Sequence, residues 1–110
     1  MGEQIKVDVG SDNIFADLGL ADPEAHRVKA ELASRIGEAL RARMLTQAAA
    51  AELLGIDQPK VSRLLRGYLT HFSAERLMRF LTLLGRDVEI VVRPAPQSRR
   101  RGRVRVVEAA

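Results

Sequence analysis

The stretch TQAAAAELLGIDQPKVSRLLRG, residues 46–67, decides the fold. Its first half consists of helix formers, with Thr46 placed to cap the first turn and Gly55 able to take the left-handed conformation of a sharp exit. A second helix can begin after Asp57, and apolar residues recur at helical spacing until Gly67. Two short helices joined by a tight turn predict a helix-turn-helix, whose second helix enters the major groove of DNA. The positions expected to be buried in this motif are Ala48, Ala51, Leu54, Ile56, Val61 and Leu64.

Helices are also predicted on both sides of the motif. A cap, a proline and an acid at residues 22–24 start a long helix that should run to about residue 43, with one apolar stripe of Val28, Leu32, Ile36 and Leu40. Phe72 should pack inside, Ser73 should cap a last helix and Gly85 should close it. The predicted fold class is mainly α, a bundle of about five helices with one C-terminal β-strand.

That strand is residues 87–93, DVEIVVR, in which Val88, Ile90 and Val92 alternate with the other side chains. A lone strand leaves its backbone groups unpaired, so it needs a partner. Residues 5–9, residues 104–107, the same strand of a second copy and a strand from another protein are all open. We expect a twofold dimer that uses this strand, through Val88, Ile90 and Val92, together with the last helix.

Three parts are expected along the chain. Residues 1–12 form a flexible N-terminal arm, and residues 13–96 form the helix-turn-helix domain, in which the apolar residues 13–20 fold back onto the core. Residues 97–110, which contain SRRRGRVRV, read as a basic disordered tail. This tail could also lie along phosphates or in a minor groove.

Composition excludes several classes of protein. The chain of 110 residues has no cysteine, which rules out disulfides and thiolate metal sites. It shows no apolar run of the ~20 residues that a membrane span needs and no signal-peptide pattern, so a cytoplasmic protein is expected. No nucleophile–base pattern, glycine-rich phosphate loop or metal constellation is evident, and His26 and His71 stand isolated. We therefore expect no enzyme activity, no cofactor, no metal and no small-molecule ligand.

The formal net charge of +4 is distributed unevenly. Residues 1–34 carry three basic and seven acidic side chains, whereas residues 35–72 carry six basic and three acidic ones. The last twelve residues add five arginines against one glutamate. Positive charge thus coincides with the helix-turn-helix and the tail, as expected for a side that faces DNA phosphates.

The motif residues also resemble a known family. Gln47-Ala48, Ala51, Leu54-Gly55-Ile56, Val61-Ser62 and Leu65-Arg66-Gly67 look like the lambda-repressor-like (Cro/cI, XRE) family, and the runs NIFADLGL (13–20) and LGRDVEIVVRP (84–94) are similar to its HigA-like antitoxin branch. The resemblance implies that bases are read by Gln58, Pro59, Ser62 and Arg63. The candidates for DNA phosphate contacts are Gln47, Lys60, Arg66, Tyr68 and Arg43.

The resemblance further implies a function. The protein would be a sequence-specific repressor that binds a double-stranded DNA operator as a homodimer. It would also be the antitoxin of a toxin–antitoxin pair, neutralising a RelE/HigB-type RNase toxin, for which the acidic first third offers a surface. Two alternatives remain: a stand-alone phage-type repressor without a toxin, and a protein-interaction module that no longer binds DNA.

Overall fold

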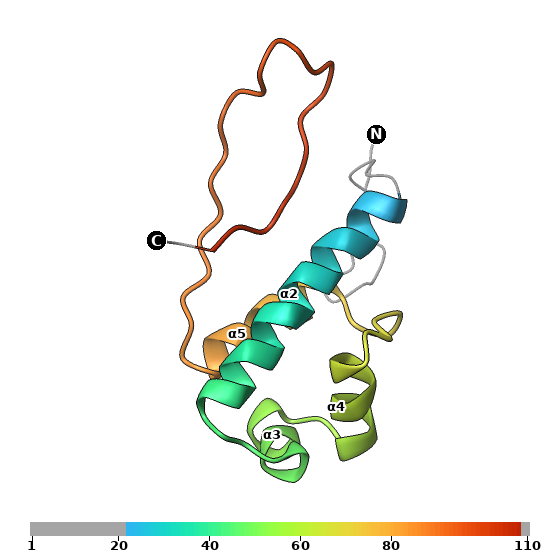
Figure 1. The fold of residues 1–110 in the computed structure, drawn as a ribbon, viewed down its shortest axis with the longest axis vertical. Helices are drawn as coiled ribbons and strands as arrows, with labels where there is room; N and C mark the ends of the chain where they lie inside the picture. Colours follow the sequence, from blue (N-terminus) through green and yellow to red (C-terminus); the bar gives the residue numbers. More distant parts are fainter. Residues whose placement is uncertain (1–21, 109–110) are drawn as a thin grey trace, which may run out of the picture.

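The computed structural model of the chain describes residues 22–108, which form four helices around one core (Figure 1). In chain order the helices are α2 (Asp22–Ala42), α3 (Gln47–Leu54), α4 (Gln58–Leu65) and α5 (Ala74–Leu83). Helix α2 packs most extensively against α5, and α3 packs against α4. The mainly helical prediction is confirmed for this part of the chain. The predicted arm, residues 1–12, and the apolar segment 13–20 lie outside the described residues.

Three of the helices begin at the side-chain caps that the sequence predicts. The hydroxyl of Thr46 accepts a hydrogen bond from the Ala49 N–H (3.1 Å) at the start of α3. At the start of α5, the hydroxyl of Ser73 accepts one from the Arg76 N–H (3.1 Å). A carboxylate, that of Asp57, does the same for α4. Each cap satisfies one of the N–H groups that have no partner within the helix.

All four helices end in a residue with a left-handed backbone. After α3, α4 and α5 that residue is a glycine: Gly55, Gly67 and Gly85. After α2 it is Met44, with φ 55°, and the Leu45 N–H donates back to the carbonyl of Leu40 (3.1 Å). This is the hydrogen bond of a Schellman ending, at which glycine is preferred because a side chain costs free energy there.

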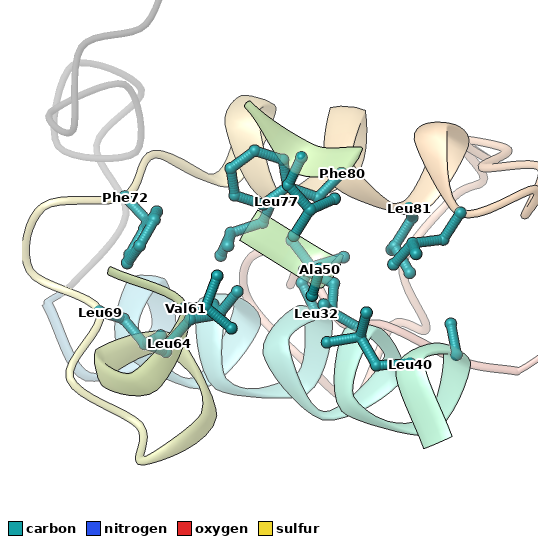
Figure 2. Close-up of a cluster of buried hydrophobic side chains, with 14 of the residues drawn as sticks. Leu32, Leu40, Ala50, Val61, Leu64, Leu69, Phe72, Leu77, Phe80 and Leu81 are labelled. Atoms are coloured by element: carbon teal, nitrogen blue, oxygen red, sulfur yellow. The ribbon is translucent and has the colours of Figure 1, made fainter. Parts of the chain in front are cut away.

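The core is aliphatic apart from two phenylalanines, Phe72 and Phe80 (Figure 2). The apolar stripe of α2 is buried as predicted, and its Ile36 is completely enclosed. Phe72, which is 1% exposed, meets Phe80 edge-to-face with ring centroids 6.1 Å apart. The guanidinium of Arg76 lies over both rings, at 5.7 and 5.6 Å from their centroids. The first turn of α5 is therefore fixed by apolar packing and by cation–π contacts together.

One predicted core position is wrong. Ala48 is exposed, and Ala50 takes its place as a buried residue of α3. The buried positions of this helix are Ala50, Ala51 and Leu54, a spacing that forms one helical face and leaves the first turn outside. In a run of four alanines, composition does not determine which side of the helix faces inward.

The predicted β-strand at residues 87–93 does not form. No strand occurs between residues 22 and 108, and the segment runs irregularly away from α5 (Figure 1). Val88 packs against the core, but Ile90 and Val92 are 77% and 90% exposed. Among the described residues the segment has no ladder partner, because two amides of residues 104–107 donate to side chains of α2 instead. Residues 5–9, another partner expected from the sequence, lie outside the described residues.

The chain after residue 96 turns and comes back along α2 (Figure 1). We call residues 104–108 the return segment. It is extended, and its Val106 is half-buried against the core. None of the four described helices combines the length and the apolar character required to cross a membrane.

Candidate nucleic-acid interface

Helices α3 and α4 form a compact unit with a tight turn between them. The Gly55 and Ile56 N–H groups both donate to the carbonyl of Ala51, at 2.9 and 3.1 Å. Asp57 Oδ1 then accepts from the Lys60 N–H at 2.9 Å, which starts α4 two residues after the turn. Because these hydrogen bonds are local, the short sequence between the two helices determines how α4 is oriented relative to α3.

Helix α4 is fastened to the core along one side only. Val61 and Leu64, at 0% and 1% exposure, face inward. The helix has just eight residues, too few to be stable alone, so these two contacts and its cap hold it in place. The opposite side is left for a partner.

The four residues expected to read bases come together on that opposite side. Gln58 and Pro59 are exposed, and Ser62 and Arg63, one turn later, are half-buried. Residues four apart on a helix are neighbours, so the pairs 58/62 and 59/63 form one continuous strip. The strip offers an amide, a hydroxyl and a guanidinium beside one apolar ring, a set that can hydrogen-bond to base edges in a major groove.

The five residues expected to contact phosphates lie around α4. Gln47 is exposed at the first position of α3, and Arg43 is exposed in the link that precedes it. Lys60 is half-buried on α4 itself. Beyond the end of α4, the Arg66 guanidinium lies 5.3 Å from the ring centroid of Tyr68, which is itself 59% exposed. Gln47 lines a hollow together with Val61 and Leu65 of α4, so it lies beside this helix.

A small hollow next to Gln47 was not predicted. It measures about 100 Å³, and its lining includes Arg41 of α2, Gln47 of α3 and Leu65 of α4. Leu65, which is 41% exposed, lines this hollow. The hollow lies where α2, α3 and α4 meet, and only the folded chain brings these residues together.

The residues expected at a dimer contact differ in exposure. Val88 is half-buried against the core of its own chain, whereas Ile90 and Val92 are exposed. As for metals, no three His, Asp or Glu side chains of residues 22–108 gather where they could hold an ion. The site that the described chain presents is therefore the α3–α4 unit.

Comparison with known proteins agrees with this geometry. Residues 14–93 match a family of helix-turn-helix domains. A solved structure of a protein named as an XRE family transcriptional regulator is 47% identical and has a TM-score of 0.76, and the match covers 81% of this chain and 100% of that one. No curated protein matches. On this match of sequence and fold, the chain belongs to the XRE-type helix-turn-helix family.

Proposed function

We propose that the protein is a sequence-specific DNA-binding transcriptional repressor that places α4 in the major groove. The observation that carries the proposal is the two-sided character of α4. Val61 and Leu64 fasten one side to the core, while Gln58, Ser62 and Arg63 line the side away from it. Neither the amide nor the guanidinium on this strip is needed by the fold, so both are available to base edges.

Each residue of the strip has a distinct role in the proposal. Gln58 pairs bidentately with an adenine, Arg63 with a guanine, and Pro59 offers an apolar contact to a thymine methyl. Ser62 donates to or accepts from either kind of base edge. Gln47, Lys60, Arg66, Tyr68 and Arg43 hold the DNA phosphates. These contacts fix the position of the protein along the duplex but do not read the base sequence.

The test begins with selection of a preferred duplex from a random library by the full-length protein. Gln58→Ala and Arg63→Ala should each reduce the preference for that duplex over a scrambled one by about fivefold to 150-fold, equivalent to roughly 1–3 kcal/mol per base contact. Binding to the scrambled duplex should change little. Arg79→Ala, an exposed cation on α5, is the matched control. Unchanged preference in both strip variants would show that α4 does not read the bases.

The proposal includes a twofold dimer formed by residues 87–93 and α5. Its support is that Ile90 and Val92 are exposed and that the segment has no ladder partner within residues 22–108. Leu83 of α5, 41% exposed, lies near the start of the same segment. A dimer would cover these apolar side chains and match two half-sites of an operator. Sedimentation should give the mass of two chains, and Ile90→Asp should give one.

We further propose that this repressor is the antitoxin of a toxin–antitoxin pair that inhibits a RelE/HigB-type RNase toxin. Seven acidic side chains against three basic ones in residues 1–34 support a basic partner. The measurement is co-purification from cells, followed by mass identification of the bound protein and an RNA-cleavage assay. A neighbouring gene for a small basic RNase that this chain inhibits is the expected result. Repression of an operator without such a partner would favour the stand-alone repressor, and a partner without operator binding would favour the interaction module.

A further inference from the structure

The return segment is tied to α2 through its backbone. The Val104 N–H donates to Glu24 Oε2 (2.9 Å), and the Val106 N–H donates to Glu31 Oε1 (3.0 Å). Residues 24 and 31 lie two turns apart on the same side of α2, and their carboxylates accept from alternate amides of the return segment. These bonds fix the path of the chain on both sides of Val106, whose side chain reaches the core.

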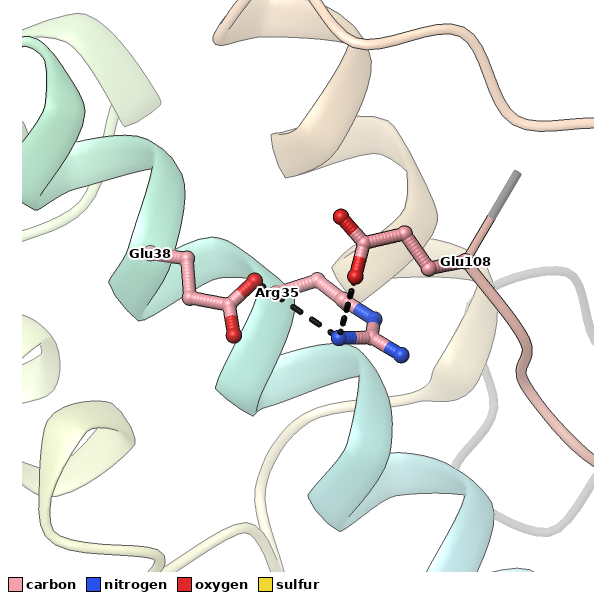
Figure 3. A network of polar contacts seen from close by, with 3 residues as sticks. All are labelled: Arg35, Glu38 and Glu108. Carbon is pink, nitrogen blue, oxygen red and sulfur yellow. Dashed lines mark hydrogen bonds and ion pairs between the residues drawn. The ribbon is translucent and has the colours of Figure 1, made fainter. Parts of the chain in front are cut away.

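A third contact closes the segment at its far end. The guanidinium of Arg35 contacts the carboxylates of both Glu108 and Glu38 (Figure 3). The N–O distances are 3.3 Å to Glu108 and 3.6 Å to Glu38. The chain leaves the domain after α5 and contacts α2 again at residues 104–108, so the residues between form a loop that is held at both ends. The most basic part of the protein, residues 99–103, lies in this loop.

The arginines of the loop are crowded together. Arg99, Arg100, Arg101 and Arg103 line one open hollow with Gly102 and Glu24. The charges of Arg99 and Arg105, with a lesser contribution from Arg27 on α2, lower the pKa of Arg103 from its ordinary value. The Nη1 atom of Arg99 is covered, yet it donates to no acceptor among residues 22–108. The crowding is unfavourable in the free protein and is relieved by any bound polyanion.

The loop lies far from the candidate DNA-reading helix. The longest dimension of the molecule is 44 Å and runs vertically in Figure 1. The turn of the loop occupies the upper end of that axis, whereas α3 and α4 occupy the lower half. With the return segment bound to α2, these arginines are therefore remote from the strip on α4.

We propose that residues 99–105 form a second nucleic-acid-binding surface, separate from α4, which holds the phosphate backbone of a duplex without regard to sequence. Five arginines supply the cations, and an arginine fork suits phosphate oxygens better than a lysine does. The turn at residues 96–103 carries no large apolar or aromatic side chain to insert into lipid, which argues against a membrane surface. This surface does not depend on base reading by α4.

The experiment compares two triple variants of the full chain that lose equal charge. In the loop variant Arg100, Arg101 and Arg103 become Gln. In the control variant Lys29, Arg79 and Arg86, none of which lies in residues 87–93, become Gln. Fluorescence anisotropy across a salt series measures binding to a random duplex of about 16 base pairs, with melting temperature and sedimentation confirming that each variant keeps its fold and mass.

The loop variant should bind the random duplex at least about tenfold more weakly at ~0.1 M salt. Its log–log salt slope should fall by about 2–3 units, because each phosphate that the protein no longer neutralises reduces the slope by about 0.9. The control variant should change the slope by less than about one unit. The loop variant should keep the preference for the selected duplex, because α4 is intact. Loss of that preference by Gln58→Ala in the same assays tests the α4 proposal separately.

Four results would overturn the proposal. An unchanged salt slope in the loop variant would show that the loop touches no phosphate. An equal loss of duplex affinity in the control variant would show that the effect depends only on the net charge of the protein. Loss of sequence preference in the loop variant would make the loop part of the α4 site. Loop-dependent binding to phosphatidylserine vesicles or polyglutamate, without loop-dependent duplex binding, would assign the arginines to a lipid or acidic-protein partner.

Discussion

The carboxylate of Asp57 acts on α4 in two ways, as a hydrogen-bond acceptor and as a negative charge, and two substitutions can separate these effects. Asp57 Oδ1 accepts from the Lys60 N–H at 2.9 Å, and the helix it caps has only eight residues. Asp57→Ala removes both the acceptor and the charge. Asp57→Asn keeps an acceptor of the same reach and removes the charge alone, so it is the matched control.

The magnitude follows from the cap. Loss of an N-cap acceptor costs about 1 kcal/mol of unfolding free energy, within a range of roughly 0.5–2. Asp57 is exposed, so the added interaction of its charge with the helix dipole lies near the lower end of about 0.3–1 kcal/mol. We expect Asp57→Ala to lower the melting temperature by about 4–8 °C and Asp57→Asn to change it by less than about 3 °C.

The two variants should differ in DNA binding as well. Both remove a negative charge beside the residues expected to face DNA, so both should bind a random duplex more tightly. Only Asp57→Ala loosens the first turn of α4, which carries Gln58 and Pro59, so only this variant should lose preference for the selected duplex. Urea unfolding followed by circular dichroism and duplex anisotropy measure the two effects. Equal stability of the Ala and Asn variants would refute the role assigned to the cap.

Three further changes test the fold and the return segment. Met44→Asn should raise the free energy of unfolding by about 0.5–1 kcal/mol, because the side chain is 88% exposed and φ is 55°; urea unfolding measures it. Leu77→Ala, at a position with 0% exposure, should lower it by about 2–5 kcal/mol in the same assay. Glu24→Ala with Glu31→Ala should speed hydrogen exchange of the return-segment amides by about threefold to tenfold, whereas Glu38→Ala should not.

The ends of the helices were predictable from the sequence because a single capping residue determines where three of them begin, and a single glycine determines where the same three end. Thr46, Asp57 and Ser73 each accept a hydrogen bond from an N–H three residues on, which requires only local chain geometry. The glycines after α3, α4 and α5 act equally locally. The common face of Gln58, Pro59, Ser62 and Arg63 followed as well, since residues four apart must share a face once the helix exists.

The rotation of α3 could not be predicted in the same way. Residues 48–51 are all alanine, so the sequence has no larger side chain to mark the inner face. Only packing against the neighbouring helices selects Ala50 over Ala48. The return segment was missed for a different reason. The sequence indicates Glu24 only as an acid in the first turn of the long helix. Nothing in the spacing of Glu24 and Glu31 shows that a chain segment 75 or more residues later donates to them.

The segment 87–93 shows how an element with correct local pattern can fail to form. Its alternation is that of a strand, but a strand exists only where another chain segment offers free N–H and carbonyl groups. Among residues 22–108 the return segment is one extended candidate, and its Val104 and Val106 amides are already donated to carboxylates of α2. Pairing these two segments would require release of the return segment, and with it of the arginines at residues 99–103. Pairing with the same segment of a second copy, as proposed above, would require no such release. The contacts of α2 therefore oppose only the ladder with residues 104–107, and residues 5–9 lie outside the described residues.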